Sequence, residues 1–399
     1  MKTCVYCGED KPDDDFSDEH IWPDALGGDL LPRDVWRTDD VCQRCNSLSG
    51  VFIDGAFIRS WMGQAELSSG SLEYLAGRPK RPILAIPLDY LGQIQDVPVP
   101  QGHVADYWAG PCGANIVHIR PDDGDEQWST YAGGDPRAKK SKAGRAYMAL
   151  TSKQEFWILV SLESFRWHFD RAKRFIVNLD IPSGWPFEAP DTNDATQAED
   201  MKTVDAVIKA GRNGDRIRLR PVISADLGNR MLAKLGLAVG YKLLGSAFLA
   251  TDYAKQLRWG MREAKPEKRR LIPVRGSGFL SGTGLNGAER VFQWPGGWVL
   301  LLNVVEGNLV LSVVAPSGRS MTISICEDQT LLAKLDPKYL EGIVWITVLA
   351  AGKAVGPISL ADYLGHQTSS ARLPELEALS SQRGDPKALP SCDGDDGMT

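Results

Sequence analysis

Two Cys-x-x-Cys pairs near the N-terminus constrain the fold of this chain more than any other feature of its sequence. Cys4 and Cys7 form the first pair, Cys42 and Cys45 form the second, and 34 residues lie between the two pairs. Each pair turns two thiolates toward one point, so two pairs together can close a tetrahedral site for Zn²⁺. Because all four ligands would be sulfur, no coordination position remains for water. The spacing therefore predicts a structural zinc site.

A structural zinc would stabilise the N-terminal part of the chain. A unit of about 60 residues rarely holds together through its hydrophobic core alone, and a Cys₄ zinc site can add on the order of 10 kcal/mol of folding free energy. A redox-active pair is the alternative for one Cys-x-x-Cys, but two such pairs in one frame favour the metal. The clustering of the seven cysteines also favours metal ligation in a reducing compartment over a disulfide framework. The remaining cysteines have no partner by spacing and are predicted to be ordinary residues; they are Cys112, Cys326 and Cys392.

A second pattern lies between and just after the two pairs. The stretch "DEHIWPDALGG" begins at Asp18, and "VCQRCN" ends at Asn46. In these motifs the chain resembles the HNH family of nucleases, in which an Asp-His or Glu-His pair is followed by Ile-x-Pro and a Gly-Gly turn, and a second Cys-x-x-Cys runs into Asn. The family has a ββα-metal fold, also called the His-Me finger, that is commonly held by a Cys₄ zinc. The resemblance covers about the first 55 to 60 residues. It implies an α+β fold class, with an N-terminal zinc-stapled ββα-metal domain followed by a larger mixed α+β domain.

The resemblance also assigns roles to residues of the motif. His20 corresponds to the general base that takes a proton from the attacking water, and a positioned imidazole typically contributes about 10² to 10⁴-fold to a rate. Glu19 and Asn46 correspond to ligands of a catalytic Mg²⁺ or Mn²⁺, since carboxylate and amide oxygens suit such hard cations. Asp54, eight residues after Asn46, is an additional candidate ligand. Glu19 and His20 are neighbours on an expected strand, where their side chains diverge unless the chain bends there.

The chain departs from the family pattern at Arg37. The family usually has a middle asparagine about nine residues before the final one, where it cross-links the ββ loop and holds the general base in place. Arg37 occupies that position here. The orienting role is therefore unassigned, and the polar residues nearby are candidates for it; these are Asp34, Thr38, Asp39 and Asp40.

Charge is distributed unevenly along the chain. Residues 1–60 hold 6 Lys and Arg against 13 Asp and Glu, and residues 370–399 hold 3 against 6, so the overall net charge of −6 leaves about +4 for the middle. Each basic clump in the middle is by itself typical of solvated surface, but together they could contact phosphates, which favours a nucleic-acid partner. The four basic clumps are residues 78–82, 137–145, 212–221 and 261–270.

The middle of the chain is expected to form the larger domain. Apolar periodicity predicts a helix followed by a strand over 153–181, a long helix from an N-cap at Ser224 to a C-cap at Gly245, and hairpins over 291–325. Residues 186–200 are predicted to be a polar loop. The expected division is a nuclease-like zinc domain at 1–60, a helical linker at 61–80, an α+β recognition or regulatory domain at 81–369 and a disordered tail at 370–399.

Together these features predict a metal-dependent HNH endonuclease that hydrolyses phosphodiester bonds, with DNA favoured over RNA and with 5′-phosphate and 3′-hydroxyl ends as products. The alternative is a non-catalytic zinc module that binds nucleic acid or protein, in which His20 is a capped or buried histidine. No stretch approaches the about 18 apolar residues of a membrane span, and acids follow the N-terminus too closely for a secretory signal, so a cytoplasmic location is expected. Analogy with the family suggests restriction or phage defence. It leaves open a homo-oligomer and a small-molecule or protein trigger acting on the C-terminal domain.

Overall fold

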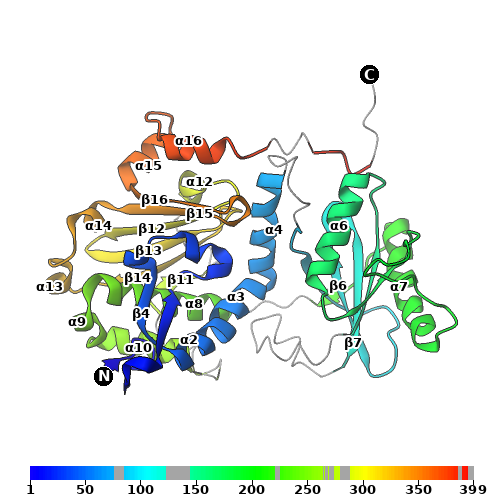
Figure 1. Cartoon of the computed structure of the whole chain (residues 1–399), viewed down its shortest axis with the longest axis horizontal. Coiled ribbons are helices and arrows are strands. Elements are labelled where there is room, and N and C mark those ends of the chain that lie inside the picture. The colour runs from blue at the N-terminus through cyan, green and yellow to red at the C-terminus, as the bar shows by residue number, and fades with distance from the viewer. Residues whose placement is uncertain are drawn as a thin grey trace. The chain divides into compact units, whose positions relative to one another are not determined.

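The computed structural model shows two compact units, each discontinuous in sequence (Figure 1). Unit 1 comprises Met1–Ile58 and Ser224–Arg383, and unit 2 comprises Arg59–Ile223 and Gly384–Thr399. Both units contain helices and a six-stranded sheet, which confirms the predicted α+β class. The residues that the structure describes are 1–75, 85–122, 144–220, 225–263, 265, 268, 274–278, 288–384 and 389–393.

The units do not follow the boundaries expected at residues 60, 80 and 369. The expected linker contains helix α4 (Trp61–Leu75), which belongs to unit 2. The prediction of a disordered tail over 370–399 is wrong for helix α16 (Pro374–Ser380), whose Leu376 and Leu379 are buried. Proline in the first turn and leucines three residues apart are typical of a short amphipathic helix. The prediction of disorder relied on the acidic composition of the tail and did not weigh this local pattern.

The first 58 residues of unit 1, called the N-terminal segment below, contain two antiparallel strand pairs followed by helix. Strand β1 pairs with β2, and β3 pairs with β4. The order β3, β4, α2 is the predicted ββα arrangement. Gly28 closes the turn after β3, where a Cβ would lie 1.9 Å from the backbone oxygen of Trp22, so only glycine fits. The elements of the segment are β1 (Lys2–Thr3), β2 (Asp10–Lys11), β3 (Phe16–His20), α1 (Arg33–Trp36), β4 (Arg37–Cys42), α2 (Gln43–Ser49), the π-helical turn η4 (Gly50–Asp54) and α3 (Gly55–Arg59).

A six-stranded antiparallel sheet forms the second part of unit 1. Strands β12, β13 and β14 follow one another in sequence and pair as neighbours, which confirms the hairpins predicted over 291–325. The strands in spatial order are β11 (Gly276–Ser277), β14 (Ser320–Cys326), β13 (Asn308–Val314), β12 (Trp298–Val305), β15 (Ile343–Val348) and β16 (Lys353–Ser359).

Helix α8 (Ala225–Leu244) packs on one face of this sheet, against β14. The approach is close at Gly236, where a Cβ would lie 2.8 Å from the side chain of Ile323. The long helix predicted here is confirmed and ends before Gly245, while the expected N-cap, Ser224, lies outside the described residues. The other helices of unit 1 beyond the N-terminal segment are α9 (Ser246–Leu249), α10 (Asp252–Arg262), α12 (Glu289–Phe292), α13 (Gln329–Leu332), α14 (Pro337–Glu341), α15 (Leu360–Gln367) and α16.

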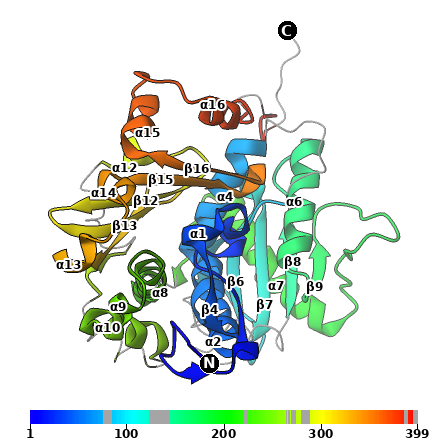
Figure 2. The same cartoon turned by 60° about the vertical axis from the view of Figure 1, so that its left-hand side comes forward.

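The N-terminal segment packs on the same face of the sheet as α8. Trp22 lies edge-on against Trp298 of β12 with ring centroids 5.5 Å apart, and Trp36 lies edge-on against Trp345 of β15 at 5.2 Å. The strand register places Trp298, Trp345 and Ile323 on one side of the sheet. Figures 1 and 2 show β4 and α8 below the sheet. The N-terminal segment is therefore part of the core of unit 1.

Unit 2 contains a second six-stranded sheet with a helix on each face (Figure 1). Helix α6 (Glu155–His168) packs on one face and α7 (Ala195–Asn213) on the other, because alternate residues of a strand point to opposite sides. The helix and strand predicted over 153–181 are confirmed by α6 and β9, whereas the polar loop predicted over 186–200 ends at Asp194, which caps α7. The strands in spatial order are β10 (Leu219–Arg220), β5 (Asp89–Ile94), β6 (His103–Ala109), β7 (Asn115–Pro121), β8 (Arg145–Ala149) and β9 (Lys173–Ile176). Among the described residues, no helix has the length and apolar character needed to cross a membrane.

A disulfide joins Cys112 and Cys392 within unit 2, across 280 positions of sequence. The prediction that these two cysteines have no partner is therefore wrong. Two hydrogen bonds hold the same part of the tail: Ser152 Oγ donates to the carbonyl of Cys392 (2.8 Å), and Trp157 Nε1 donates to the carbonyl of Pro390 (2.6 Å). Local spacing carries no signal for a contact of this range, which is why it fails to predict the pair.

Candidate functional site

The four cysteines of the two Cys-x-x-Cys pairs meet in the structure. The Sγ atoms of Cys4, Cys7, Cys42 and Cys45 all lie within 4.8 Å of one another. Within the described ranges, this is the one group of three or more His, Cys, Asp or Glu side chains with metal-binding geometry. The first pair lies in the loop between β1 and β2, and the second joins the end of β4 to α2. The cluster has the ligand type and number of a structural zinc site, as the spacing predicts.

The thiols of the cluster differ in acidity, and thiolate is the form of cysteine that binds metal. Burial raises the pKa of Cys7 to about 11, and the hydrogen bond with Cys4 raises the pKa of Cys45. The pKa of Cys4 is lowered to about 4, first by a hydrogen bond with the Cys45 thiol and also by backbone N–H groups, and these effects outweigh burial. One of those donors is the N–H of Cys42, 3.3 Å from the Cys4 sulfur. Zn²⁺ binding requires deprotonated cysteines, so the metal would displace the protons that Cys7 and Cys45 hold, and the fit of the site rests on its four clustered sulfur atoms.

Helix α10 braces the loop that carries the first cysteine pair. Arg258 Nε donates to the carbonyl of Val5 (3.1 Å), and Arg262 Nη1 donates to the carbonyl of Cys7 (3.4 Å). A zinc ion with four thiolate ligands carries a net negative charge, so two guanidinium groups on its loop are electrostatically favourable. Residues beyond the N-terminal segment thus take part in holding the zinc loop.

The hairpin of β3 and β4 separates Glu19 from His20. In its register Glu19 lies opposite Thr38 and His20 lies opposite Arg37, so the two pairs are on opposite sides of the hairpin. Glu19 and Thr38 are buried, whereas His20 and Arg37 are partly exposed. The two neighbours that the resemblance assigns to one site therefore point away from each other, as the alternation of a strand requires.

On the buried side, Glu19 forms an ion pair with a lysine from α8. Lys234 Nζ lies 2.9 Å from Glu19 Oε1 and 2.6 Å from Asp54 Oδ2, and it donates to the backbone oxygen of His20 at 3.1 Å. Tyr6 donates a further hydrogen bond to Glu19 (3.0 Å). The side chain of Lys234 is 0% exposed and that of Glu19 is 3% exposed. An ammonium group has three donors, and here each donor has an acceptor.

The charges of this buried group depend on one another. Burial alone would lower the pKa of Lys234, but the carboxylates of Asp54 and Glu19 outweigh it and the pKa is raised. The pKa of Asp54 is raised to about 6, first by burial and then by the nearby Glu19, against the opposing effect of Lys234. Lys234 is thus a charged lysine whose two carboxylate partners come from the N-terminal segment.

Replacing Lys234 by methionine is expected to destabilise unit 1 by about 3 to 5 kcal/mol, because it leaves two buried carboxylates without their counter-charge. The measurement is the free energy of unfolding from denaturant titration. Lys255→Met on α10 is the matched control, since Lys255 forms an exposed ion pair with Asp252 one helical turn away. Equal stability losses in the two variants would contradict the role given to the buried pair.

The residues predicted to hold a catalytic cation already have other partners. Glu19 and Asp54 already share the ammonium of Lys234, so a divalent cation between them would meet a positive charge. The side-chain amide of Asn46 is also engaged: its Nδ2 donates to Ser17 Oγ (3.0 Å) and to the backbone oxygen of Asp18 (2.9 Å). In this arrangement the predicted set does not fit Mg²⁺ or Mn²⁺, which need several oxygen ligands around one ion.

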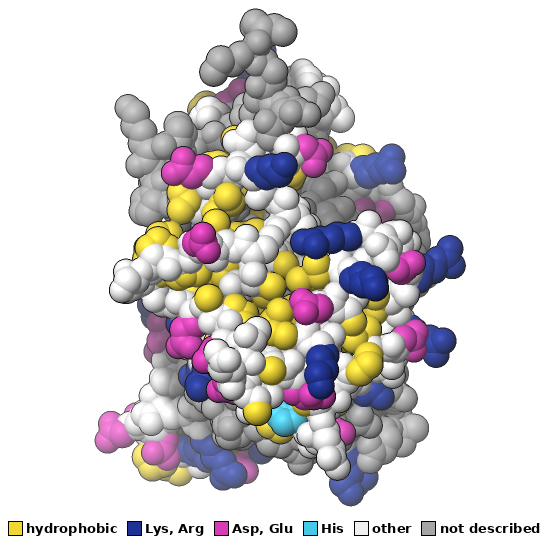
Figure 3. Space-filling view, turned by 90° about the vertical axis from the view of Figure 1, so that its right-hand side faces the viewer, with side chains coloured by type: hydrophobic (Ala, Val, Ile, Leu, Met, Phe, Trp, Pro, Cys, Tyr) yellow, Lys and Arg dark blue, Asp and Glu magenta, His cyan; other side chains and the backbone are white. Residues whose placement is uncertain are grey.

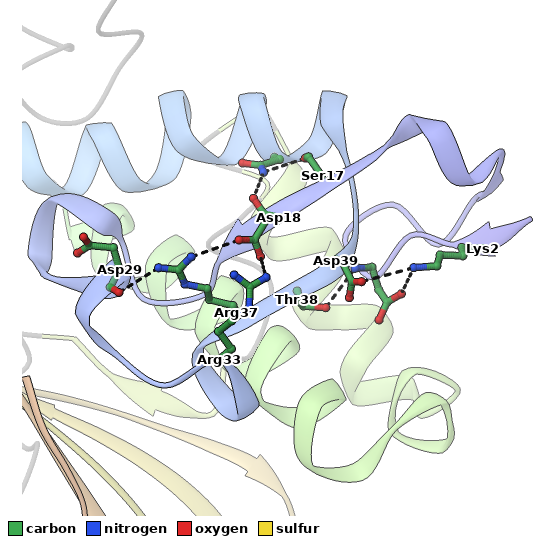
Figure 4. Close-up of polar contacts among 10 residues, drawn as sticks. Lys2, Ser17, Asp18, Asp29, Arg33, Arg37, Thr38 and Asp39 are labelled. Atoms are coloured by element: carbon green, nitrogen blue, oxygen red, sulfur yellow. Dashed lines mark hydrogen bonds and ion pairs between the residues drawn. The ribbon is translucent and has the colours of Figure 1, made fainter.

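On the partly exposed side of the hairpin, Asp18 holds two arginines (Figure 4). Arg33 Nη2 lies 3.0 Å from Asp18 Oδ1, and Arg37 Nη1 lies 3.3 Å from Asp18 Oδ2. Arg37 Nη2 donates to the backbone oxygen of Asp29 (3.0 Å), in the loop between the two strands. Arg37 therefore ties β3, β4 and their connecting loop together, and it does so next to His20.

The polar neighbours considered for the orienting role have other partners. Asp34 accepts from the N–H of Val35, and Thr38 Oγ1 accepts from the N–H of Asp40. Asp40 also accepts from the hydroxyl of Tyr241 at 2.8 Å. Asp39 lies on the exposed surface near Lys2 (Figure 4).

Sequence reasoning missed Asp18 and Lys234. Asp18 directly precedes the Glu-His pair, but the family pattern assigns no role to that position. Lys234 lies in a helix whose neighbouring residues Leu232, Ala233 and Leu235 are all buried. A lysine within such an apolar face is the signal that could have indicated a buried ion pair, although not its partners.

The basic clumps are only partly described. The clump at 212–221 is described up to Arg220, and Arg218 within it lies 3.5 Å from Asp96. On the face drawn in Figure 3, the coloured Lys and Arg side chains are spread among acidic and apolar ones. The clumps at 78–82 and 137–145 lie wholly or largely outside the described residues, and the clump at 261–270 lies half outside them.

Comparison with protein families supports the assignment of the N-terminal segment. Residues 4–62 match a family model described as HNH endonuclease. The match contains the four cysteines and the Glu-His pair, and it confirms the resemblance for this part of the chain. Searches of curated proteins and of solved structures gave no match.

Proposed function

We propose that this protein is an endonuclease that hydrolyses phosphodiester bonds in DNA, with His20 as the general base. The observation that carries the proposal is the match of residues 4–62 to the HNH endonuclease family, together with the state of His20 inside the matched segment. Its Nε2 atom is buried and has no hydrogen-bond partner among the described residues. Since buried polar atoms are nearly always paired, this unpaired imidazole nitrogen lacks the partner that a substrate or a water molecule would supply.

The chemistry requires few groups from the protein. Hydrolysis needs a base that takes a proton from water and positive charge that offsets the charge developing on the phosphate. Imidazole supplies the base near neutral pH. The family is the ground for proposing Mg²⁺ or Mn²⁺ as the cofactor. No step is assigned to the ion, because Glu19 and Asp54 are already paired with Lys234. A cytoplasmic location and a role in restriction or phage defence are proposed from family analogy alone.

The test is cleavage by the purified, zinc-loaded full chain. Supercoiled plasmid, single-stranded DNA and RNA are each incubated without added metal, with Mg²⁺ and with Mn²⁺. We expect nicked or linear plasmid only with added metal, and ends that a ligase can reseal because they carry 5′-phosphate and 3′-hydroxyl groups. Cleavage of RNA but not DNA would contradict the proposed substrate. If all three nucleic acids stay intact but are bound, the alternative of a non-catalytic zinc module is favoured.

A further inference from the structure

His20 and Arg37 are directly opposite on the paired strands, and each leaves one nitrogen buried and unpaired. The two atoms are His20 Nε2 and Arg37 Nε, and neither has a hydrogen-bond partner among the described residues. Each unpaired buried polar atom costs free energy, typically about 1 to 3 kcal/mol, so two on facing residues call for an explanation. A ligand that satisfies both nitrogens at once would provide one.

The chemistry of the two atoms limits what that ligand can be. Arg37 Nε can only donate a hydrogen bond, because an arginine stays protonated in proteins. A neutral His20 can accept one at Nε2. The ligand must therefore present an oxygen acceptor to Arg37 and an O–H donor to His20. A phosphate oxygen beside a water molecule meets both demands, whereas a metal ion cannot bind to a guanidinium group.

Arg37 is held by both of its terminal nitrogens, which leaves Nε as its unpaired donor. Its two terminal nitrogens are engaged by Asp18 and by the backbone oxygen of Asp29, and its side chain is 17% exposed. Arg33 shares Asp18 but is 66% exposed. Of the two arginines, Arg37 is therefore the one whose guanidinium group is held in place. The N-terminal segment around it is strongly negative. A fixed positive charge of this kind is suited to receiving an anion.

Distances on the hairpin are compatible with this arrangement. Residues directly opposite on antiparallel strands have Cβ atoms about 4.5 to 5.5 Å apart. Side chains that extend from such a pair can contact two neighbouring oxygen atoms. In a near-attack arrangement the water oxygen lies about 3 to 3.5 Å from phosphorus, and therefore beside the phosphate oxygens.

We propose that Arg37 binds an oxygen of the scissile phosphate through its Nε–H, beside the water that His20 deprotonates. This inference rests on the proposed function, and it makes Arg37 a catalytic residue of that site. In the step, a bond forms between the water oxygen and phosphorus and the bond from phosphorus to the leaving oxygen breaks. His20 takes the proton of the water, and the leaving oxygen takes a proton from solvent. Arg37 exchanges no proton and only donates hydrogen bonds to the charged phosphate.

The first test uses inorganic phosphate and needs no activity. The side-chain NMR signals of the five histidines are recorded during phosphate titration, and the His20→Ala spectrum identifies the His20 signal. We expect phosphate to shift the His20 signal in the wild type and in Arg33→Ala, and to leave it unshifted in Arg37→Ala. An unchanged phosphate response in Arg37→Ala would overturn the inference, whether or not the protein cuts DNA.

The second test is kinetic. We expect Arg37→Ala to lower kcat on the order of 10²-fold, as loss of one donor to a developing oxyanion does, with a smaller change in KM. Arg37→Lys keeps the charge without the Nε–H and is expected to fall between Arg37→Ala and the wild type. Arg44→Ala, which removes an exposed arginine of α2, is the control for net charge and is expected to act like the wild type.

Folding is checked by the zinc content of each variant. Arg37→Ala could lose zinc because the contact with Asp29 is gone. In that case the role of Nε is judged from Arg37→Lys, since a lysine preserves the length and charge of the side chain. Wild-type kcat and phosphate response in a zinc-loaded Arg37→Lys would overturn the role of Nε. A wild type that cuts nothing while its phosphate response depends on Arg37 would contradict the nuclease and support the phosphate site.

Discussion

Replacing Cys42 by serine is expected to cost the protein its zinc and the folded state of the N-terminal segment. Three sulfur ligands bind Zn²⁺ much more weakly than four, and the metal contributes on the order of 10 kcal/mol to the folding of small zinc units. The wild type should contain about one zinc per chain, measured by elemental analysis, and Cys42→Ser should contain little. The loss of structure is then measured by circular dichroism and by limited proteolysis, in which new cleavage sites should appear within residues 1–58.

The matched control for this prediction is Cys326→Ser. Cys326 is a buried, free cysteine of unit 1 that lies on β14, outside the zinc cluster. A serine there should leave the zinc content unchanged. Normal zinc content and normal proteolytic resistance in Cys42→Ser would show that the cysteine cluster binds no structural metal.

The loss of zinc should also extend beyond the N-terminal segment. Trp22 and Trp36 pack on the sheet of unit 1, and Lys234 of α8 has its carboxylate partners in the segment. Unfolding of the segment would expose that sheet face and leave the lysine buried without counter-charges. Unit 2 has its own core and the disulfide between Cys112 and Cys392, so it should keep its melting transition.

The parts of the structure that could be predicted from sequence are those set by local spacing. The cysteine frame, the ββα order and the helix ending before Gly245 depend on residues a few positions apart, or on a motif short enough to recognise. The strand alternation that separates Glu19 from His20 is of the same kind, and it follows from the period of two in any strand.

The parts that could not be predicted depend on contacts between distant positions. Unit 1 joins the N-terminal segment to residues 224–383, so its boundary has no composition shift to mark it. The partners of Lys234 lie about 200 positions away, and the cysteine pair of unit 2 is 280 positions apart. Helical periodicity marks Lys234 as buried but does not indicate which carboxylates face it.

Replacing His20 by alanine is expected to lower kcat for plasmid cleavage by about 10² to 10⁴-fold, the typical contribution of a general base. His103→Ala is the matched control, because His103 lies on β6 of unit 2 and contacts the backbone oxygen of Gln101. Its rate should equal that of the wild type. A His20→Ala variant that cleaves at the wild-type rate would remove His20 from the mechanism and leave the cleavage itself to be explained by other groups.

The structure also indicates that His20→Ala should report on chemistry and not on folding. Lys234 donates to the backbone oxygen of His20, a contact that alanine retains, and Arg37 is held by Asp18 and Asp29, which the substitution does not touch. Zinc content and the unfolding free energy should therefore stay close to those of the wild type. Addition of free imidazole to a His20→Gly variant supplies the missing base in solution, so partial recovery of the rate is expected if the imidazole acts as a base. If imidazole restores the rate of His20→Gly but not that of the double variant His20→Gly with Arg37→Ala, the two residues act on the same phosphate.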